Sequence, residues 1–458
     1  MVESNMIVLK KYNLLVIAGV LASCSVYQPD PLPTHFSLPD TIPHLLIDQQ
    51  NRTSLKSHPI DPSNGLDMDE VATVAVLNNP DLKIARADAG IARAQAFSAG
   101  LLPDPQLALS SDLSNTGVGP GSVRAFSAGI SYDFLPLLTY HANDAAAQAE
   151  FKKIDLNLLW QEWQVVAQAR LLYVKLTSAQ KLQSLLEKNR DYFSERVNSI
   201  YVAVNKNIIG NEAVLPDQSA LQDVQRQLND LERQTNQNRH DLNALLGVSP
   251  DAQVLLREGM LLPDIDEDAL AQNVNQLLLR RPDLMALESG FQAQDERYRA
   301  ALLAQFPALN VGFTHARDNA GIYSDGLGVT LSLPLFNRNR GNVAIEKATR
   351  DKLVADYQLR LDSANSDIHR MLVERSINSR QLHEIQISLI RFSAMASNAD
   401  TALQKNSIDT LIVSNAHTAL LTRQVEEIGI QQAMLEQQVA LLALIGGELP
   451  VQLNLEKN

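Results

Sequence analysis

The sequence contains a single cysteine, Cys24, among 458 residues, which excludes an internal disulfide bond and a zinc site built from cysteines. Aromatic residues make up only 5% of the chain, whereas alanine, leucine and glutamine are frequent. That composition favours long packed helices over a sandwich of strands. The formal net charge is −13, and nucleic-acid binding needs clustered lysine and arginine. Nucleic acid is therefore not an expected partner.

Proline and glycine are missing from two long stretches. Residues 137–215 and 335–449 contain no internal proline, and residues 143–209 and 342–428 contain no glycine. Apolar residues recur there at intervals of three and four, the spacing of helices that pack side by side. A single helix over residues 142–205 would be about 95 Å long at 1.5 Å per residue. A helix of that length needs partners alongside it, because a compact globule cannot bury it.

Each long stretch contains one segment suited to reversing the chain. Residues 205–211 can supply the left-handed residues that end a helix. Residues 405–409 offer Asn406 for the turn, with a serine and Asp409 as N-caps for the following helix. Each stretch is therefore predicted to form a helical hairpin.

The N-terminus has the features of a secretory signal. Lys10 and Lys11 precede a short apolar run, and the small residues Ala22 and Ser23 stand before Cys24. The run is shorter than the roughly 20 residues that cross a bilayer. Leu-Ala-Ser-Cys resembles a bacterial lipobox, in which the cysteine is acylated and becomes the mature N-terminus. The alternative is an ordinary signal peptide with a cysteine nearby by chance.

The chain is predicted to be a tandem repeat. Asn79-Pro80-Asp81-Leu82 recurs 202 residues later with arginine in first place, and three further landmarks recur in the same order at offsets of 198 to 202. The predicted divisions are a signal peptide (1–23), an anchor and proline-punctuated extended tail (24–68), a first repeat (69–248), a linker (249–266), a second repeat (267–447) and a tail (448–458). Each repeat is expected to contain a helical segment (near 69–101 and 267–303), two short strands and a helical hairpin, and each helical segment is expected to be broken at its Asn-Pro-Asp or Arg-Pro-Asp sequence.

The predicted strands alternate between apolar and polar residues. Near residues 126–134 and 327–333, one face is apolar and the other is small or polar; the second face carries Ser127, Gly129, Ser131, Asp133, Gly328, Thr330 and Ser332. Such a strand either packs on the core of a soluble sandwich or faces lipid in a barrel. Four strands cannot close a barrel, and an open edge is not tolerated in lipid. Three copies would supply twelve strands around a polar lumen.

Three stretches resemble the hallmark sequences of the TolC-like outer-membrane efflux family: residues 281–284 (Arg-Pro-Asp-Leu), 306–309 (Phe-Pro-Ala-Leu) and 331–336 (Leu-Ser-Leu-Pro-Leu-Phe). The resemblance extends over about residues 69–446 and includes the internal repeat. Residues 334–342, Pro-Leu-Phe-Asn-Arg-Asn-Arg-Gly-Asn, look most like family members that serve heavy-metal efflux pumps.

This resemblance implies a mainly α fold with a small β portion. Its expected form is a homotrimer with a twelve-stranded barrel in the outer membrane, above a long α-helical barrel in the periplasm. A periplasmic adaptor protein and an inner-membrane pump are the implied partners, and the protein would be a passive, lipid-anchored duct. The helix reversals would form the periplasmic tip, with gating or adaptor-contact candidates Lys206, Asn207, Gly210, Asp217, Lys405, Asn406 and Asp409. Asp409 could equally be a plain helix cap.

No catalytic, metal or cofactor site is predicted. Residues 117–122 are rich in glycine, but they lack the lysine of a phosphate-binding loop and lie between two strands. The histidines His315, His369, His383 and His417 are scattered, without the spacing of a ligand set. Two alternatives remain open: a periplasmic coiled-coil scaffold or adaptor lipoprotein without a pore, and a lipid-anchored periplasmic enzyme.

Overall fold

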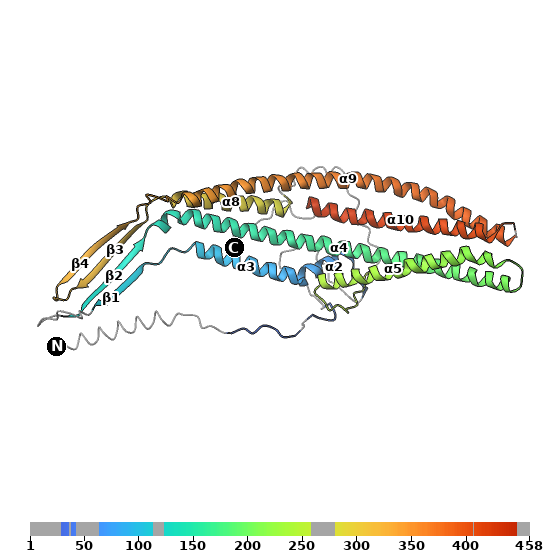
Figure 1. The fold of residues 1–458 in the computed structure, drawn as a ribbon, viewed down its shortest axis with the longest axis horizontal. Helices are drawn as coiled ribbons and strands as arrows, with labels where there is room; N and C mark the ends of the chain where they lie inside the picture. Colours follow the sequence, from blue (N-terminus) through green and yellow to red (C-terminus); the bar gives the residue numbers. More distant parts are fainter. Residues whose placement is uncertain are drawn as a thin grey trace. The chain divides into compact units, whose positions relative to one another are not determined.

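The computed structural model describes residues 29–35, 38–42, 64–112, 123–257, 280–405 and 407–446. The chain divides into two compact units, Met1–Leu38 and Pro39–Asn458, and every described helix and strand belongs to the second (Figure 1). The predicted signal sequence and Cys24 lie outside the described residues, as do residues 113–122 and residues 258–279, which hold half of the predicted linker and the start of the second predicted helical segment.

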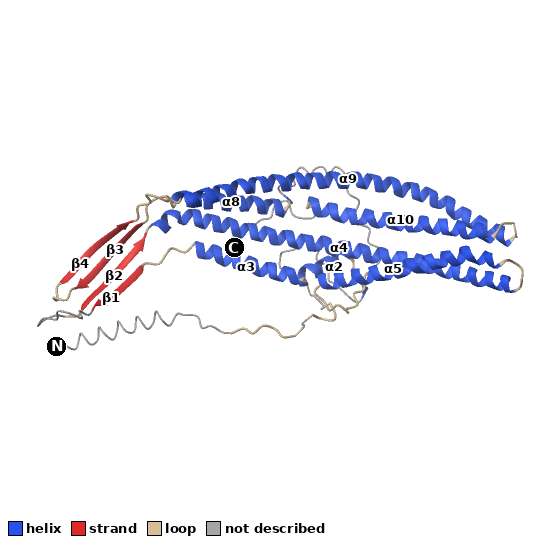
Figure 2. Ribbon diagram, in the orientation of Figure 1, coloured by secondary structure: helices blue, strands red, loops and turns tan. Residues whose placement is uncertain are grey.

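Four strands form one antiparallel sheet in the order β1-β2-β3-β4 (Figure 2). They are β1 (Gln106–Asp112), β2 (Ala125–Asp133), β3 (Leu309–Arg317) and β4 (Tyr323–Leu331). β2 from the first half of the chain pairs directly with β3 from the second half. The β3–β4 pairing continues to Arg317 and Tyr323, so residues 318–322 alone connect these two strands.

The described residues of the first half form four α-helices. These are α2 (Met68–Asn78), α3 (Pro80–Ala99), α4 (Leu135–Asn205) and α5 (Leu215–Leu245), with a short 3₁₀ helix, η2 (Asn211–Val214), before α5. Asp67 begins α2 with a reciprocal capping box, and the Asn79 side chain caps α3 by accepting from the Leu82 amide at 3.0 Å. The predicted break at Asn79-Pro80 is confirmed. The 71 residues of α4 correspond to about 107 Å of helix.

The second half contributes α8 (Pro282–Leu303), α9 (Arg340–Gln404) and α10 (Thr410–Ile445). α9 and α10 pack on each other, α4 packs on α8 and α10, and the two long hairpins therefore lie side by side. The sheet lies at one end of α4 and α9, and the helix reversals lie at the other end (Figure 1).

The element order in residues 80–245 is found again in residues 282–445: helix, two strands, long helix, returning helix. One contact occurs in both halves. Gly247, at φ +64°, has no room for a Cβ, which would be 2.6 Å from the Asn78 carbonyl oxygen. Gly446, at φ +61°, packs in the same way on the Arg280 carbonyl. The predicted duplication accounts for this correspondence, and the predicted repeat boundaries remain predictions.

The largest apolar core lies midway along the helices, where α2 and the end of α5 pack on α4. Val71 and Ala169 are fully buried there, and the Trp163 indole in α4 donates to the Ala443 carbonyl in α10 at 3.0 Å. Part of the proline-punctuated segment also joins this core: Ile42 packs against it, and the Ser249 amide donates to the Pro39 carbonyl. These two contacts hold residues 39–42 against the helical core, and the extended tail over residues 24–68 stays a prediction.

Among the described helices, only α10 is long and apolar enough to cross a membrane; the mean hydropathy of its most apolar 18 residues is 1.2. α10 carries an Arg423–Glu426 ion pair and packs on α9, α4 and α5. Only 17% of that apolar window is buried within the single chain, although three helices flank α10.

Candidate functional site: the strand sheet and the helix reversals

One face of the sheet is small and polar. The cross-strand register aligns Ser131 with Gly312 and Gly312 with Gly328, and the neighbouring row aligns Asn310 with Thr330. Ser127 and Gly129 lie on this face by strand alternation. Asp133 is the last residue of β2, and its Oδ1 accepts a hydrogen bond from the Leu135 amide at 3.0 Å. Ser332 directly follows β4. The structure thus brings all seven predicted lumen residues to one face or to its helix-side end.

The opposite face is apolar. One row crosses all four strands as Leu107, Ile130, Phe313 and Leu327, and the next row contains Tyr132, Val311 and Val329. Leu107 and Leu327 are 70% and 76% exposed in the single chain. No described element covers this face, so it is available to an apolar environment outside the protomer.

The apolar face ends in a polar rim at the strand ends furthest from the helices. His315 Nδ1 lies 2.6 Å from Asp325 Oδ1 across β3 and β4. The Arg317 guanidinium lies over Phe126 and Tyr323, 5.3 and 5.8 Å from the ring centroids. Aromatic and charged side chains at a strand end are typical of a membrane–water boundary.

The first helix reversal depends on Asn207. This residue is left-handed, with φ 56°, and lies directly after Lys206, the C-cap of α4. Asparagine tolerates this conformation better than most residues do. Gly210 is extended, with φ −73°, and precedes η2. Of the predicted reversal residues, Asn207 therefore makes the turn and Gly210 does not.

Asp217 lies in the first turn of α5 and is fully buried. Its two carboxylate oxygens accept from Arg196 Nε and Nη2 of α4 at 2.9 and 3.0 Å. Arg196 also donates to the Thr410 carbonyl of α10 at 3.4 Å. Burial alone would lower the pKa of Arg196, but the hydrogen bond and charge of Asp217 outweigh it and raise that pKa. This bidentate pair joins both helical hairpins.

A second polar link lies beside that pair. The Tyr192 hydroxyl of α4 donates to Asp400 of α9 at 3.3 Å, and His417 Nε2 of α10 lies 3.0 Å from both Asp400 oxygens. The Tyr192 and His417 rings are 4.2 Å apart. Burial raises the pKa of Tyr192 well above its ordinary value, and Asp400 adds to this although Arg196 opposes it. Tyr192 is therefore a neutral donor that ties the hairpins together.

The second reversal connects Lys405, the C-cap of α9, to Asp409, the N-cap of α10. The Asp409 side chain accepts from the Leu411 amide at 3.2 Å, so this residue is a helix cap. Asn406 lies outside the described residues. Lys206, Lys405 and Asp409 are exposed at this end, whereas Asp217 is buried behind it.

A third buried cluster occupies the Arg-Pro-Asp-Leu motif. Asp283 accepts from Arg281 at 3.0 and 2.6 Å and from Arg360 of α9 at 2.8 Å, and the Arg281 guanidinium lies 5.1 Å from the Trp160 ring of α4. Burial would raise the pKa of Asp283, but the two arginines hold it below the ordinary value. The motif therefore fixes the start of α8 to both long helices.

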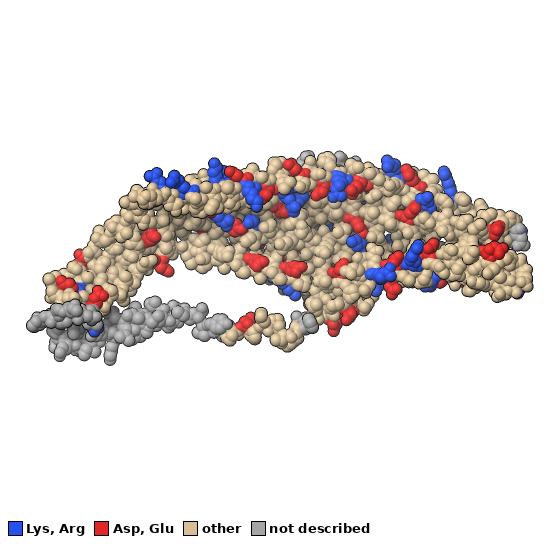
Figure 3. Space-filling view, viewed as in Figure 1, with Lys and Arg blue, Asp and Glu red and all other residues tan. Residues whose placement is uncertain are grey.

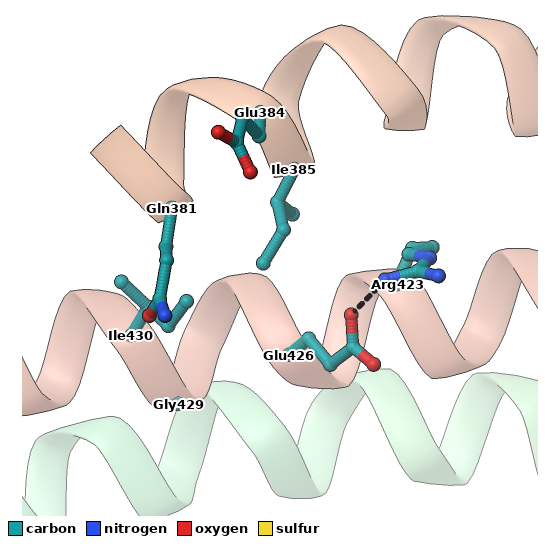
Figure 4. A pocket seen from close by; sticks show the side chains of 7 residues that line it. All are labelled: Gln381, Glu384, Ile385, Arg423, Glu426, Gly429 and Ile430. Carbon is teal, nitrogen blue, oxygen red and sulfur yellow. Dashed lines mark hydrogen bonds and ion pairs between the residues drawn. The ribbon is translucent and has the colours of Figure 1, made fainter. Parts of the chain in front are cut away.

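A hollow of about 460 Å³ lies between α9 and α10. Its lining includes Glu384, Arg423 and Glu426, and Arg423 is already paired with Glu426 at 2.6 Å (Figure 4). A Cβ added at Gly429 would meet no atom within 4 Å, so the hollow is open there. In the described part of the chain, no three potential metal-binding side chains gather in one place.

Comparisons with known proteins agree with this geometry. Residues 273–447 match the family model "Outer membrane efflux protein". The chain is 23% identical over 465 residues to the probable outer membrane lipoprotein SilC of Salmonella typhimurium, covering 95% of this chain and 97% of SilC. It is 23% identical to the cation efflux system protein CusC of Escherichia coli, covering 94% and 98%. The structure of the Campylobacter jejuni CmeC outer membrane channel has the same fold, with a TM-score of 0.72 at 18% identity and coverage of 93% and 95%.

The second half of the chain thus matches the outer membrane efflux family model, and nearly the whole chain is similar in sequence to SilC and CusC and in fold to CmeC. The matched family and these structural neighbours are channels rather than enzymes. The sequence missed Arg196, Tyr192 and Asp400, which carry the links behind the reversals. Their partners lie 17 to more than 200 residues away, and no local pattern marks them.

Proposed function

We propose that this chain is one protomer of a homotrimeric outer-membrane channel in a tripartite efflux system. One observation carries the proposal: a four-stranded sheet has one apolar and one polar face, and neither edge strand has a second neighbour among the described residues. In lipid, unpaired backbone groups are costly, so both edges need partners. β4 of one protomer pairing with β1 of the next would close twelve strands around the small polar residues.

The helical portion would continue this conduit through the periplasm. α4 and α9 each extend about 100 Å away from the sheet, which is a reach suited to spanning the periplasm. The reversal residues would then form the far tip, where a periplasmic adaptor and an inner-membrane pump dock. Lys206, Lys405 and Asp409 are the exposed candidates for contact, and Asp217 is a candidate for holding the tip in shape.

Cation cargo is the proposed substrate class. SilC and CusC match nearly the whole chain, and CusC is described as a cation efflux protein. We also propose that acylated Cys24 anchors the mature N-terminus in the outer membrane. The pump supplies the energy in this scheme, and the duct itself conducts passively.

Closure of the barrel is tested by cross-linking the free edges. Ala108→Cys in β1 and Gly326→Cys in β4 lie on the polar face and are separated within one chain by two intervening strands, about 14 Å. That distance excludes an internal disulfide. A short thiol-specific cross-linker is therefore expected to join protomers into a denaturation-resistant trimer. The single variant Ala108→Cys is the control and should give no trimer ladder.

Conduction is tested with the purified protein in planar bilayers. Discrete current steps are expected, and their absence in preparations that insert would refute the channel. A non-pore scaffold or adaptor lipoprotein would give neither the steps nor the edge-to-edge trimer. Loss of cation resistance in a deletion strain, restored by the intact gene, tests the cargo separately.

A further inference from the structure

The junction between β4 and α9 carries an exposed patch that the conduit does not use. We call it the junction patch and define it as Leu333, Leu335, Phe336, Arg338 and Arg340. Phe336 is 89% exposed, and Leu333 and Leu335 are 64% and 65% exposed. Leu333 continues the apolar alternation of Val329 and Leu331. The patch is therefore continuous with the apolar face of the sheet.

The patch has a defined backbone. Arg338 and Asn339 are both left-handed, and the Asn339 side-chain amide donates to the Ala301 carbonyl of α8 at 2.9 Å. The Arg340 amide donates to the Asn337 carbonyl at 3.1 Å. The turn is thus tied to the end of α8, and Phe336 and the two arginines project from a fixed support.

The positive charge of the patch is not balanced by acidic residues nearby in the sequence. Residues 326–345 contain two arginines and no aspartate or glutamate. Within the described part of the chain, neither Arg338 nor Arg340 forms an ion pair, and the Arg340 guanidinium donates to the Phe336 carbonyl at 3.2 Å. Figure 3 shows basic side chains gathered over the start of α9.

The equivalent junction in the first half has a different character. β2 passes into α4 through Phe134 alone, and residues 125–151 contain no lysine or arginine. A general need for charge where a strand meets a long helix would place basic residues at both junctions. The basic charge is instead confined to the β4–α9 junction, which points to a specific partner there.

We infer that the junction patch binds anionic phospholipid of the periplasmic leaflet. This inference rests on the proposed function, because it requires the sheet to lie in the outer membrane with its helices in the periplasm. Phe336 and the leucines would lie among the upper acyl chains. Arg338 and Arg340 would extend to the lipid phosphates, as long basic side chains do at membrane interfaces. The charge complementarity selects an anionic over a zwitterionic headgroup.

Tryptophan quenching tests the inference in the full-length protein. Phe336→Trp is reconstituted in vesicles of phosphatidylethanolamine and phosphatidylglycerol, with brominated acyl chains on one lipid at a time. The native Trp160 and Trp163 lie in the middle of α4 and provide an unquenched background. Each arginine near an anionic surface contributes about a fivefold preference, so the two together predict a preference of up to about 25-fold for phosphatidylglycerol. High salt should reduce it.

Matched variants isolate the two arginines. Arg338→Gln with Arg340→Gln should bring the preference close to one and leave quenching by the acyl chains in place. Arg380→Gln with Arg391→Gln removes the same charge from exposed positions farther along α9 and should change nothing. Equal quenching by both lipids in the starting protein would overturn the inference, and so would an absence of quenching, which places Phe336 against another protomer. Failure to insert into vesicles at all would instead refute the proposed function.

Discussion

The buried Arg196–Asp217 pair makes a quantitative prediction about the tip. Asp217 is fully buried and Arg196 is mostly buried, so removing the carboxylate leaves a guanidinium without its counter-ion in a desolvated site. Breaking a buried pair in this way costs roughly 3–5 kcal/mol. Asp217→Asn keeps the size and one acceptor oxygen, which favours the lower value, about 3 kcal/mol.

That loss should appear as local opening of the helices behind the reversal. Because 1.4 kcal/mol corresponds to a factor of ten, about 3 kcal/mol predicts a roughly hundredfold faster amide hydrogen exchange near Arg196 and Asp217. Exchange measured by mass spectrometry on the intact protein reports this directly. The core around Val71 and Ala169 lies far along the helices and should keep its protection.

The control for this experiment lies on the same helix. Asp223 pairs with Arg226 at the surface, with side-chain exposures of 60% and 71%, and such pairs contribute about 0.5 kcal/mol or less. Asp223→Asn should therefore change exchange by less than about threefold. If Asp217→Asn behaved like Asp223→Asn, the assignment of Asp217 as the residue holding the tip would be wrong.

Three further predictions concern the sheet, the Arg-Pro-Asp-Leu cluster and the second reversal. Thr330→Lys on the polar face should leave membrane insertion intact and shift ion selectivity toward anions, which reversal potentials measure. Val329→Lys on the apolar face should destabilise the inserted protein by roughly 2–4 kcal/mol and reduce membrane insertion, which vesicle flotation measures. Asp283→Asn should destabilise the protein by about 3 kcal/mol at neutral pH. The pKa of Asp283 is lower in the folded than in the unfolded protein. The stability that Asp283 contributes relative to asparagine is therefore complete above about pH 4 and is lost as the pH falls further. Melting curves of both proteins at several pH values measure this loss. Asp409→Ala removes a cap worth about 1 kcal/mol and should raise leak conductance or lower resistance; no change in either would leave Asp409 as a helix cap alone.

Local features of the fold could be predicted from the sequence. The Asn79-Pro80 break, the strand alternation around Ile130 and the two proline-free helices each depend on residues close together in the chain. The positions of the two helix reversals could be predicted for the same reason. Which residue adopts the left-handed turn was not determined, because asparagine and glycine both permit it; the structure assigns it to Asn207.

The polar links between helices could not be predicted. Arg196 meets Asp217 because α4 and α5 lie antiparallel at a particular rotation, and a small change in that rotation would point Arg196 elsewhere. Tyr192 meets Asp400, 208 residues away, only after the two hairpins have packed together. Over helices of 65 and 71 residues, small departures from 3.6 residues per turn accumulate, so spacing alone does not fix which faces meet.

The sequence by itself determined the elements: two strand hairpins, two long helical hairpins and a polar strand face opposite an apolar one. Whether a segment forms a helix, a strand or a turn depends mainly on residues within a few positions of one another. The apolar–polar alternation and the helix-breaking residues are such local features, so the sequence shows them directly. The tertiary structure alone decided that β2 pairs with β3, that the sheet keeps two edges without a further strand among the described residues, that Asp217 is buried against Arg196 and that Asp283 is buried between two arginines. These arrangements depend on how distant helices and strands pack against each other, and packing is a property of the folded chain.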